Sequence, residues 1–89
     1  MKDDVEKPIR LTQHAKQQLS YRGTTEEEVK DTIRTCKWEP AELNRMECRK
    51  NLRYDKNWND KHYRTKQVQP IFVEEENEIV VVTVYTYYF

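Results

Sequence analysis

Four side chains that could move protons or hold a phosphate group are spread along this chain of 89 residues. They are His14, Arg22, Lys66 and Tyr85. Cleavage of RNA without a metal needs a general base for the 2′-hydroxyl, a general acid for the leaving oxygen, and a cation for the charge that develops on the phosphate. Histidine, lysine, arginine and tyrosine can fill these roles. The four residues are therefore the candidate catalytic set, provided that the fold brings them together.

A second group consists of cations and rings that could bind RNA without reacting with it. Cations meet the phosphates of RNA, and aromatic planes stack on its unpaired bases. The candidates for this role are Arg53, His62, Arg64 and Tyr87. Residues 44–67 carry eight basic and three acidic side chains, so a local positive field persists although the formal net charge is zero. A charge-rich segment can equally be an ordinary solvated surface, and both interpretations stay open.

Each candidate also has a purely structural explanation. His14 could hydrogen-bond to a backbone carbonyl, and Arg22 could cap a helix end and pair with a carboxylate. Tyrosines suit any strand, and most lysines and arginines are plain surface cations. The residue types alone therefore do not decide between a site and a scaffold.

Metal ligands are few and widely spaced. The ligand types present include Cys36, Cys48, His14 and His62, but no two of them have the close spacing of zinc sites. A single glycine cannot build a phosphate-cradling loop. We therefore expect no metal and no cofactor.

Two helices joined by a tight turn must position the first two candidates. An apolar stripe recurs at helical spacing through residues 11–22, and both His14 and Arg22 fall on or beside it. The first helix should begin at or next to Thr12 and end at Arg22. The only glycine, Gly23, should then form a left-handed cap.

The second helix should begin at a capping box formed by Thr25 and Glu28. Its inward face should carry Val29, Ile33 and Cys36. Because the turn between the helices is so short, we expect them to be antiparallel.

The remainder of the chain has the pattern of strands. Residues 46–54 alternate weakly, and residues 55–60 have the composition of a loop. Residues 61–73 predict a strand in which Pro70 disfavours a central position.

The last strand, residues 79–89, is β-branched and aromatic throughout, so we expect it to be central in the sheet. Residues 74–77 connect it to the strand before. Alternation predicts an aliphatic core face made of Val80, Val82 and Val84. The opposite face then carries a row of hydroxyl groups, Thr83, Tyr85 and Tyr87. If His62, Arg64 and Lys66 lie beside that row, one surface of the sheet combines cations with hydroxyls.

The expected fold class is α+β, with an N-terminal antiparallel helical hairpin packed on a three- to four-stranded antiparallel sheet. Residues 1–8 form a polar tail and residues 9–89 a single domain. Hydrophobic and charged residues each make up 36%, so the core must be small and a stabilising homodimer is plausible. The two cysteines do not make a disulfide framework, and we find no membrane span or signal peptide, so we expect a cytoplasmic protein.

Three segments of the chain resemble a known family. They are LTQHA at residues 11–15, YRGTTEEEV at residues 21–29 and VVTVY at residues 81–85. Together they resemble the domain of unknown function 4258 family, which looks related to the RelE and BrnT type toxins of toxin–antitoxin systems. The resemblance covers most of the chain, roughly residues 9–85.

The resemblance implies a RelE-like fold and a metal-independent endoribonuclease that a cognate antitoxin protein neutralises. By position, the family's HA motif falls on His14 and its RG motif on Arg22. RelE-type enzymes use lysines, arginines and a late tyrosine, for which Lys66, Arg64 and Tyr85 or Tyr87 are the nearest counterparts here.

Two other functions remain open. The same scaffold could be a non-catalytic module that binds RNA or a protein partner through the open face of the sheet. It could also be a structural subunit whose terminal strand pairs with another chain.

Overall fold

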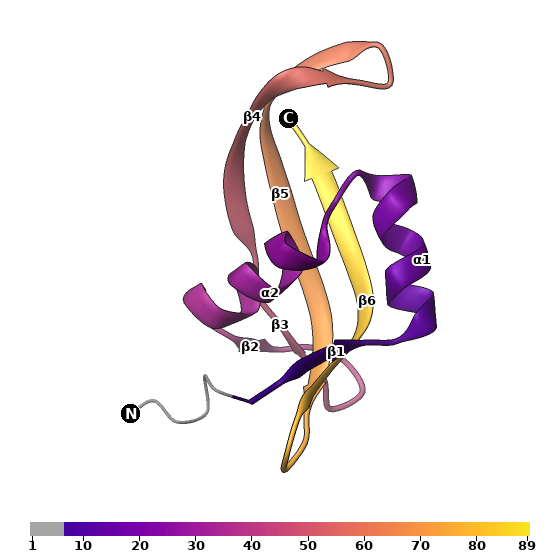
Figure 1. Cartoon of the computed structure of the whole chain (residues 1–89). Helices are drawn as coiled ribbons and strands as arrows, with labels where there is room; N and C mark the ends of the chain where they lie inside the picture. The colour runs from indigo at the N-terminus through magenta and orange to yellow at the C-terminus, as the bar shows by residue number, and fades with distance from the viewer. Residues whose placement is uncertain (1–6) are drawn as a thin grey trace.

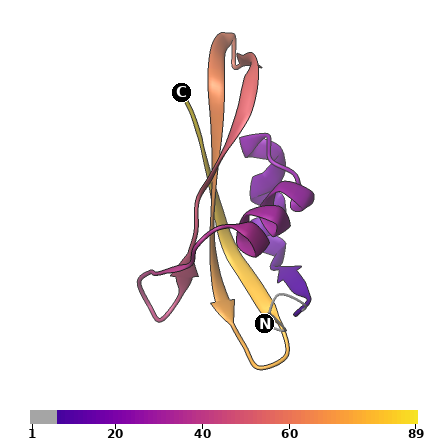
Figure 2. The same ribbon diagram turned by 90° about the vertical axis from the view of Figure 1, so that its left-hand side faces the viewer.

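Two helices lie on one side of a long, twisted sheet (Figure 1). The computed structural model describes residues 7–89. The elements in chain order are β1 (Ile9–Leu11), α1 (Gln13–Arg22), α2 (Glu26–Thr35), β2 (Glu39–Pro40), β3 (Met46–Glu47), β4 (Lys50–Trp58), β5 (Lys61–Glu74) and β6 (Ile79–Tyr88). Figure 2 shows both helices on one face of the sheet, and the loop between β2 and β3 projecting beyond the other face. The expected α+β class is confirmed.

The sheet has six strands in the order β1-β6-β5-β3-β2, with β4 also paired to β5. Only β1 and β6 are parallel, and the other pairs are antiparallel. The strand count therefore exceeds the expected three to four. The central strand is β5 and not the last strand, because β6 has a second neighbour only where β1 pairs with Ile79, Val80 and Val81.

Pro70 lies inside the central strand, a position that the sequence disfavoured. Thr65 and Phe89 exchange both backbone hydrogen bonds, at 2.8 and 3.0 Å, so by alternation the backbone nitrogen of Pro70 points away from β6. On its other side are β3 and β4, which pair with β5 in the same register, Glu47↔Ile71 and Lys50↔Val68. The nitrogen of Pro70 points at the gap between these two strands. Proline has no N–H to donate, and the neighbouring strand is interrupted opposite it.

The helix ends follow the sequence prediction. The Thr12 side chain accepts a hydrogen bond from the backbone N–H of Ala15 at 3.1 Å, and Gly23 adopts a left-handed φ of 70°. At α2, Glu28 N–H donates to the Thr25 hydroxyl and Thr25 N–H donates to the Glu28 carboxylate, at 3.1 and 3.0 Å. Both caps and the capping box are confirmed.

The two helices are not antiparallel, and that expectation is wrong. Figure 1 shows α1 running along β6, while α2 lies across β5. The turn between them is fastened to the sheet, because the hydroxyls of Thr24 and Thr86 lie 2.7 Å apart. Each helix therefore packs its own apolar stripe on the sheet and not on the other helix.

A bulge in β6 shifts the predicted core face. Ile71 pairs with Thr83 but Phe72 pairs with Val81, so Val82 has no partner. In a regular strand the residues on either side of Val82 would share a face, but here Val81 shares the helix-covered face with Phe72 and Thr83 shares the other face with Ile71. Val81 and Val84 are fully buried, whereas Val82 is only partly buried. The predicted core row is therefore correct for Val84 and wrong for Val82, and Val80 is buried but lies with Val73 on the other face of the sheet from Val84.

The predicted loop at residues 55–60 is mostly strand. Only Asn59 and Asp60 form the turn between β4 and β5, with φ values of 53° and 68°. Two positive φ values at the centre of a two-residue hairpin are typical of a type I′ turn, which Asn and Asp tolerate. A bulge between Arg53 and Lys56 adds further twist to this hairpin.

The end of the predicted polar tail contacts the sheet. Residues 1–6 of that tail lie outside the described residues. Ile79 N–H donates to Pro8 O at 2.9 Å, and the Lys7 ammonium lies 2.9 Å from the Glu74 carboxylate. Across residues 7–89, neither helix has the length and apolar character needed to cross a membrane.

Candidate functional site

On the helix-covered face, Lys66 is enclosed by partners. It is 5% exposed, and its ammonium donates to Gly23 O at 2.7 Å and to the Glu28 carboxylate at 2.8 Å. The capping box holds the same carboxylate in place. Val68 and Phe72 continue the alternation of Lys66 along β5 and are fully buried beneath the helices. Lys66 therefore fastens the helix–helix turn to the sheet.

An aromatic cluster surrounds this contact. Tyr88 stacks on Trp58 with ring centroids 5.0 Å apart, and Tyr54 and Tyr63 lie 5.1 and 5.7 Å from it. The Tyr88 hydroxyl donates to Arg22 O. Burial, with smaller contributions from Tyr54 and Glu28, raises the pKa of Tyr88 to about 12. This cluster is a packed joint between the β4–β5 hairpin and the end of α1.

The expected cleft built from His14, Arg22, Lys66 and Tyr85 does not form. His14 is exposed on α1, and no hydrogen bond or ion pair joins it to any residue between 7 and 89. Lys66 lies on the helix-covered face with Glu28, so the expectation of one cationic row beside the tyrosines is wrong for it. The reason is the register, because Lys66 is opposite Tyr88 and shares its face.

The opposite, open face of the sheet carries three parallel rows of side chains. They alternate with helix-facing residues, so they point away from the helices. The aromatic row on β6 and its end consists of Tyr85, Tyr87 and Phe89, which are 40%, 46% and 57% exposed. The polar row on β5 consists of Gln69, Gln67 and Thr65, of which Gln69 is only 6% exposed. The arginine row on β4 and the residue before it consists of Arg49, Asn51 and Arg53.

The pairing of strands lines up these rows. Tyr87 is opposite Gln67, and Gln67 is opposite Asn51. At the end of the sheet Phe89 bonds to Thr65, which is opposite Arg53. Neighbouring strands lie about 4.8 Å apart, so an aromatic ring and an arginine of the same line are separated by roughly 10 Å at the backbone.

Two shallow depressions indent this face. The larger, with a volume of about 600 Å³, lies between the aromatic row and the β2–β3 loop. Its charged residues are Arg45, Arg49, Glu42 and Glu47. The second, of about 530 Å³, contains Arg53, Arg64 and Asp55. Each depression therefore offers two guanidinium groups to a ligand, beside a smaller or equal number of carboxylates.

The candidate Arg22 connects the two faces. Its backbone oxygen belongs to the buried joint with Tyr88, but its guanidinium carbon lies 5.6 Å from the centre of the Tyr85 ring. Its Nε is buried and has no hydrogen-bond partner among residues 7–89. Of the four predicted catalytic residues, the structure thus brings two together, Arg22 and Tyr85.

The predicted RNA-binding residues lie along the open face and the β4–β5 hairpin. His62 Nε2 is 3.2 Å from the Asp55 carboxylate, which also lies 3.5 Å from the Arg53 guanidinium. The hydrogen bond from His62, with a smaller contribution from Arg53, lowers the pKa of Asp55. Arg64 lines the second depression, and Tyr87 belongs to the aromatic row.

The acidic hairpin between β5 and β6 lies at the far end of the sheet from the β4–β5 hairpin (Figure 1). Two of its carboxylates are paired, Glu74 with Lys7 and Glu78 with Arg10, at 2.9 and 3.0 Å. The acidic residues of this turn are therefore partly neutralised and away from the aromatic row.

The sequence interpretation did not select Arg45 and Arg49 as binding residues. A signal was present, because odd-numbered residues from 45 to 53 are polar, while Met46, Cys48 and Leu52 between them are apolar. Alternation of this kind, interrupted here only by Lys50, marks a strand with one open face. Within residues 7–89, no group of three or more His, Cys, Asp or Glu side chains is arranged to hold a metal ion.

Comparisons of the chain with protein-family models, with curated proteins and with solved structures give no significant match.

Proposed function

We propose that the protein binds single-stranded RNA on the open face of its sheet. The observation that carries this proposal is the alignment of the aromatic row with the arginine row across β5. Aromatic rings stack on unpaired bases, and arginines contact phosphates. Of the polar row between them, Gln67 can present its amide to the edge of a base, whereas Gln69 is buried and donates to the Glu47 carboxylate at 2.7 Å.

The proposal favours unpaired RNA over a duplex. In a duplex the bases are stacked on each other, and rings on the surface of a sheet cannot reach their faces. Tyr85, Tyr87 and Phe89 are exposed on the open face and can accept splayed bases.

A second candidate function is metal-independent cleavage of RNA on the same face. The observation that favours it is the contact between Arg22 and Tyr85. The phenol of Tyr85 could transfer a proton, while Arg22 and Arg49 would stabilise the charge developing on the phosphate. In this proposal His14 and Lys66 take no part in the chemistry.

The biological role proposed with this function is that of a RelE-like toxin. Two helices on one face of a mostly antiparallel sheet support this proposal at the level of the α+β class. A cognate antitoxin protein would then neutralise the toxin by covering the open face. A non-catalytic RNA- or protein-binding module is the alternative on the same scaffold, and either could act as a homodimer.

Binding and cleavage can be separated in one experiment. Labelled single-stranded RNA of mixed sequence is incubated with the protein in the presence of a chelator, and both anisotropy and fragment length are followed. Binding with intact RNA supports the module, and fragments that disappear in Tyr85→Phe support the enzyme. Neither binding nor fragments with folded protein would exclude both proposals.

A further inference from the structure

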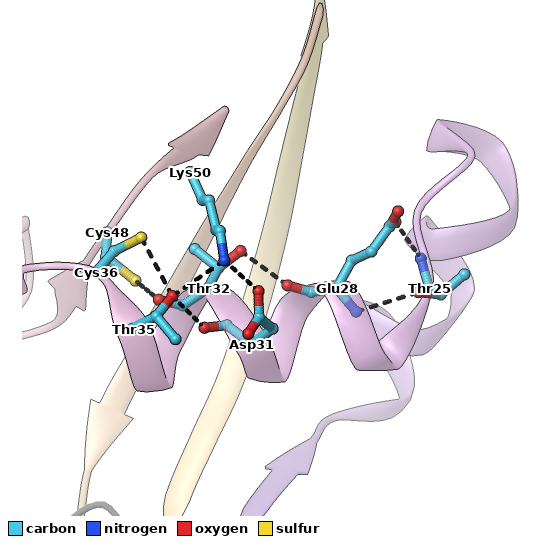
Figure 3. Close-up of polar contacts among 8 residues, drawn as sticks. All are labelled: Thr25, Glu28, Asp31, Thr32, Thr35, Cys36, Cys48 and Lys50. Atoms are coloured by element: carbon cyan, nitrogen blue, oxygen red, sulfur yellow. Dashed lines mark hydrogen bonds and ion pairs between the residues drawn. The ribbon is translucent and has the colours of Figure 1, made fainter. Parts of the chain in front are cut away.

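The C-terminal end of α2 and the gap between β3 and β4 carry the two cysteines of the chain. Cys36 is the C-cap of α2 and is partly exposed, and Cys48 lies in the gap and is buried. Figure 3 shows both thiols at the same end of α2, beside Thr35 and Lys50. The candidate site is independent of the open face, because these side chains lie on the helix-covered side.

One carbonyl oxygen brings the two cysteines together. Thr32 O accepts a hydrogen bond from the backbone N–H of Cys36 at 3.1 Å and from the Cys48 thiol at 3.6 Å. The Cys48 sulfur therefore lies within a side chain's reach of the Cys36 backbone. The Cys36 sulfur lies 3.6 Å from the Thr35 hydroxyl on the same turn of helix.

The strand register agrees with this proximity. Glu39 pairs with Glu47, so the same alignment extended by one residue sets Trp38 opposite Cys48. Cys36 is two residues before Trp38 and is therefore a diagonal neighbour of Cys48. Diagonal neighbours of this kind are separated by about 7–8 Å between Cα atoms, with their Cβ atoms closer. A disulfide needs a Cα separation of roughly 4.4–6.8 Å, so the helix end must approach the strand slightly.

We propose that Cys36 and Cys48 are a redox-modification site, at which a hydroperoxide drives formation of a reversible disulfide between α2 and the strand that contains β3 and β4. The disulfide would join the two ends of the segment between Cys36 and Cys48. It would also link α2 covalently to the gap between β3 and β4, where Pro70 donates no hydrogen bond to the neighbouring strand.

The two thiols have different roles in the reaction. Burial, with smaller contributions from Cys36 and Glu47, raises the pKa of Cys48 to about 12, so this thiol does not start the reaction. The partly exposed Cys36 is the sulfur that meets the oxidant. The ammonium of Lys50, which is paired with the Asp31 carboxylate, also donates to the Thr35 hydroxyl at 3.3 Å, so a proton donor lies on the turn that carries Cys36.

Two steps complete the proposed reaction with hydrogen peroxide. In the first, the Cys36 thiolate attacks one peroxide oxygen, the O–O bond breaks, and Cys36 becomes a sulfenic acid while hydroxide leaves. In the second, Cys48 gives up its proton and attacks the Cys36 sulfur, the S–O bond breaks, and the departing hydroxide takes that proton as water. The two thiols lose two electrons together, and the peroxide is reduced to water.

Peroxide treatment of the full chain tests the proposal by intact mass, thiol alkylation and thermal unfolding. Wild-type protein should lose the mass of two hydrogens, resist alkylation at both cysteines, and regain both thiols with dithiothreitol. The oxidised chain should stay monomeric under denaturing conditions without reductant. Its unfolding midpoint should rise by roughly 5 °C or more, since a short loop is closed in the unfolded state.

Single variants test the order of the steps. Cys48→Ala should stop at a sulfenic acid on Cys36 that dimedone traps, and Cys36→Ser should keep Cys48 as a free thiol. If Cys48→Ala does not fold, Cys36→Ser alone still tests the order, because Cys36 is the partly exposed C-cap of α2 and serine is close to it in size. Covalent dimers as the main product, sulfinic acid in the wild type, or a lowered unfolding midpoint after oxidation would overturn the proposal.

Discussion

The two faces of the sheet carry the same kinds of side chain and differ in what surrounds them. On the helix-covered face, the polar groups of Lys66 and Tyr88 form hydrogen bonds to other groups of the protein. On the open face, Arg49 and Tyr87 are exposed. A cation and a tyrosine thus form a structural joint on one face and remain available to a ligand on the other.

Among the changes that test this comparison, we expect the largest loss of stability from a substitution at Gly23. A Cβ added there would lie 2.6 Å from Trp58 Cζ3 and 2.7 Å from the Tyr88 hydroxyl, at a φ of 70°. Gly23→Ala should therefore lower the free energy of unfolding by about 3 kcal/mol or more. Urea titration measures the loss, and Ser20→Ala, an exposed change on the preceding helix, should shift it by no more than about 0.5 kcal/mol.

A matched pair of cations gives the next largest difference. Lys66→Met removes one partner of a buried ion pair and leaves Glu28 and Gly23 O without it, so we expect a loss of about 3 kcal/mol. Arg49→Met, on the open face, should change the free energy of unfolding by less than about 0.5 kcal/mol. Equal losses in the two variants would show that the faces do not differ in this way.

A pair of tyrosines should differ by a smaller amount. Tyr88→Phe removes the hydrogen bond to Arg22 O and should cost about 1 kcal/mol, whereas Tyr87→Phe should be close to neutral. The two variants differ by one hydroxyl group each, so chemical denaturation compares the faces directly. A larger cost at Tyr87 would contradict the assignment.

The same joint predicts a dependence on alkaline pH. Burial raises the pKa of Tyr88 from 10.0 to about 12, so its protonated form is favoured in the folded state. Its contribution is fully present below pH 10 and is lost as the pH rises toward 12. Cys48, whose pKa is raised from 9.0 to about 12, acts in the same direction. The decline in unfolding free energy above pH 10 should be shallower in Tyr88→Phe than in the wild type.

The helix ends could be predicted from the sequence because their signals are local. Thr12, Gly23, and the pair of Thr25 and Glu28 determine caps through contacts within four residues along the chain. The exposure of Tyr85 and Tyr87 also followed from simple alternation. These features need no knowledge of what packs against them.

The features that the sequence predicted wrongly depend on partners far away along the chain. The bulge at Val82 follows from pairing with β5, and Lys66 is buried because Glu28 lies across from it in space. The turn between the helices contacts the sheet through the hydroxyls of Thr24 and Thr86, which are 62 residues apart in the chain. Alternation along a single strand cannot show which face a helix will cover, and one bulge reverses it.

The smallest expected effect concerns the salt dependence of RNA binding. Arg49→Gln and Arg53→Gln should each reduce the slope of log affinity against log salt by about 1 if each guanidinium contacts a phosphate. Lys16→Gln, on the exposed side of α1, should leave the slope unchanged. Identical slopes in all three variants would mean that phosphates do not lie along the arginine row.

The most direct test of the central claim is RNA binding by a variant that lacks the tyrosines of the aromatic row. Tyr85→Ala combined with Tyr87→Ala should weaken the binding of labelled single-stranded RNA by roughly 30-fold or more, since each stacked base contributes about 1–3 kcal/mol. Tyr21→Ala removes a tyrosine that is 81% exposed on α1 and serves as the matched control. We expect a large loss in the double variant and unchanged binding in the control. Equal affinity of the wild type and a folded double variant would contradict it.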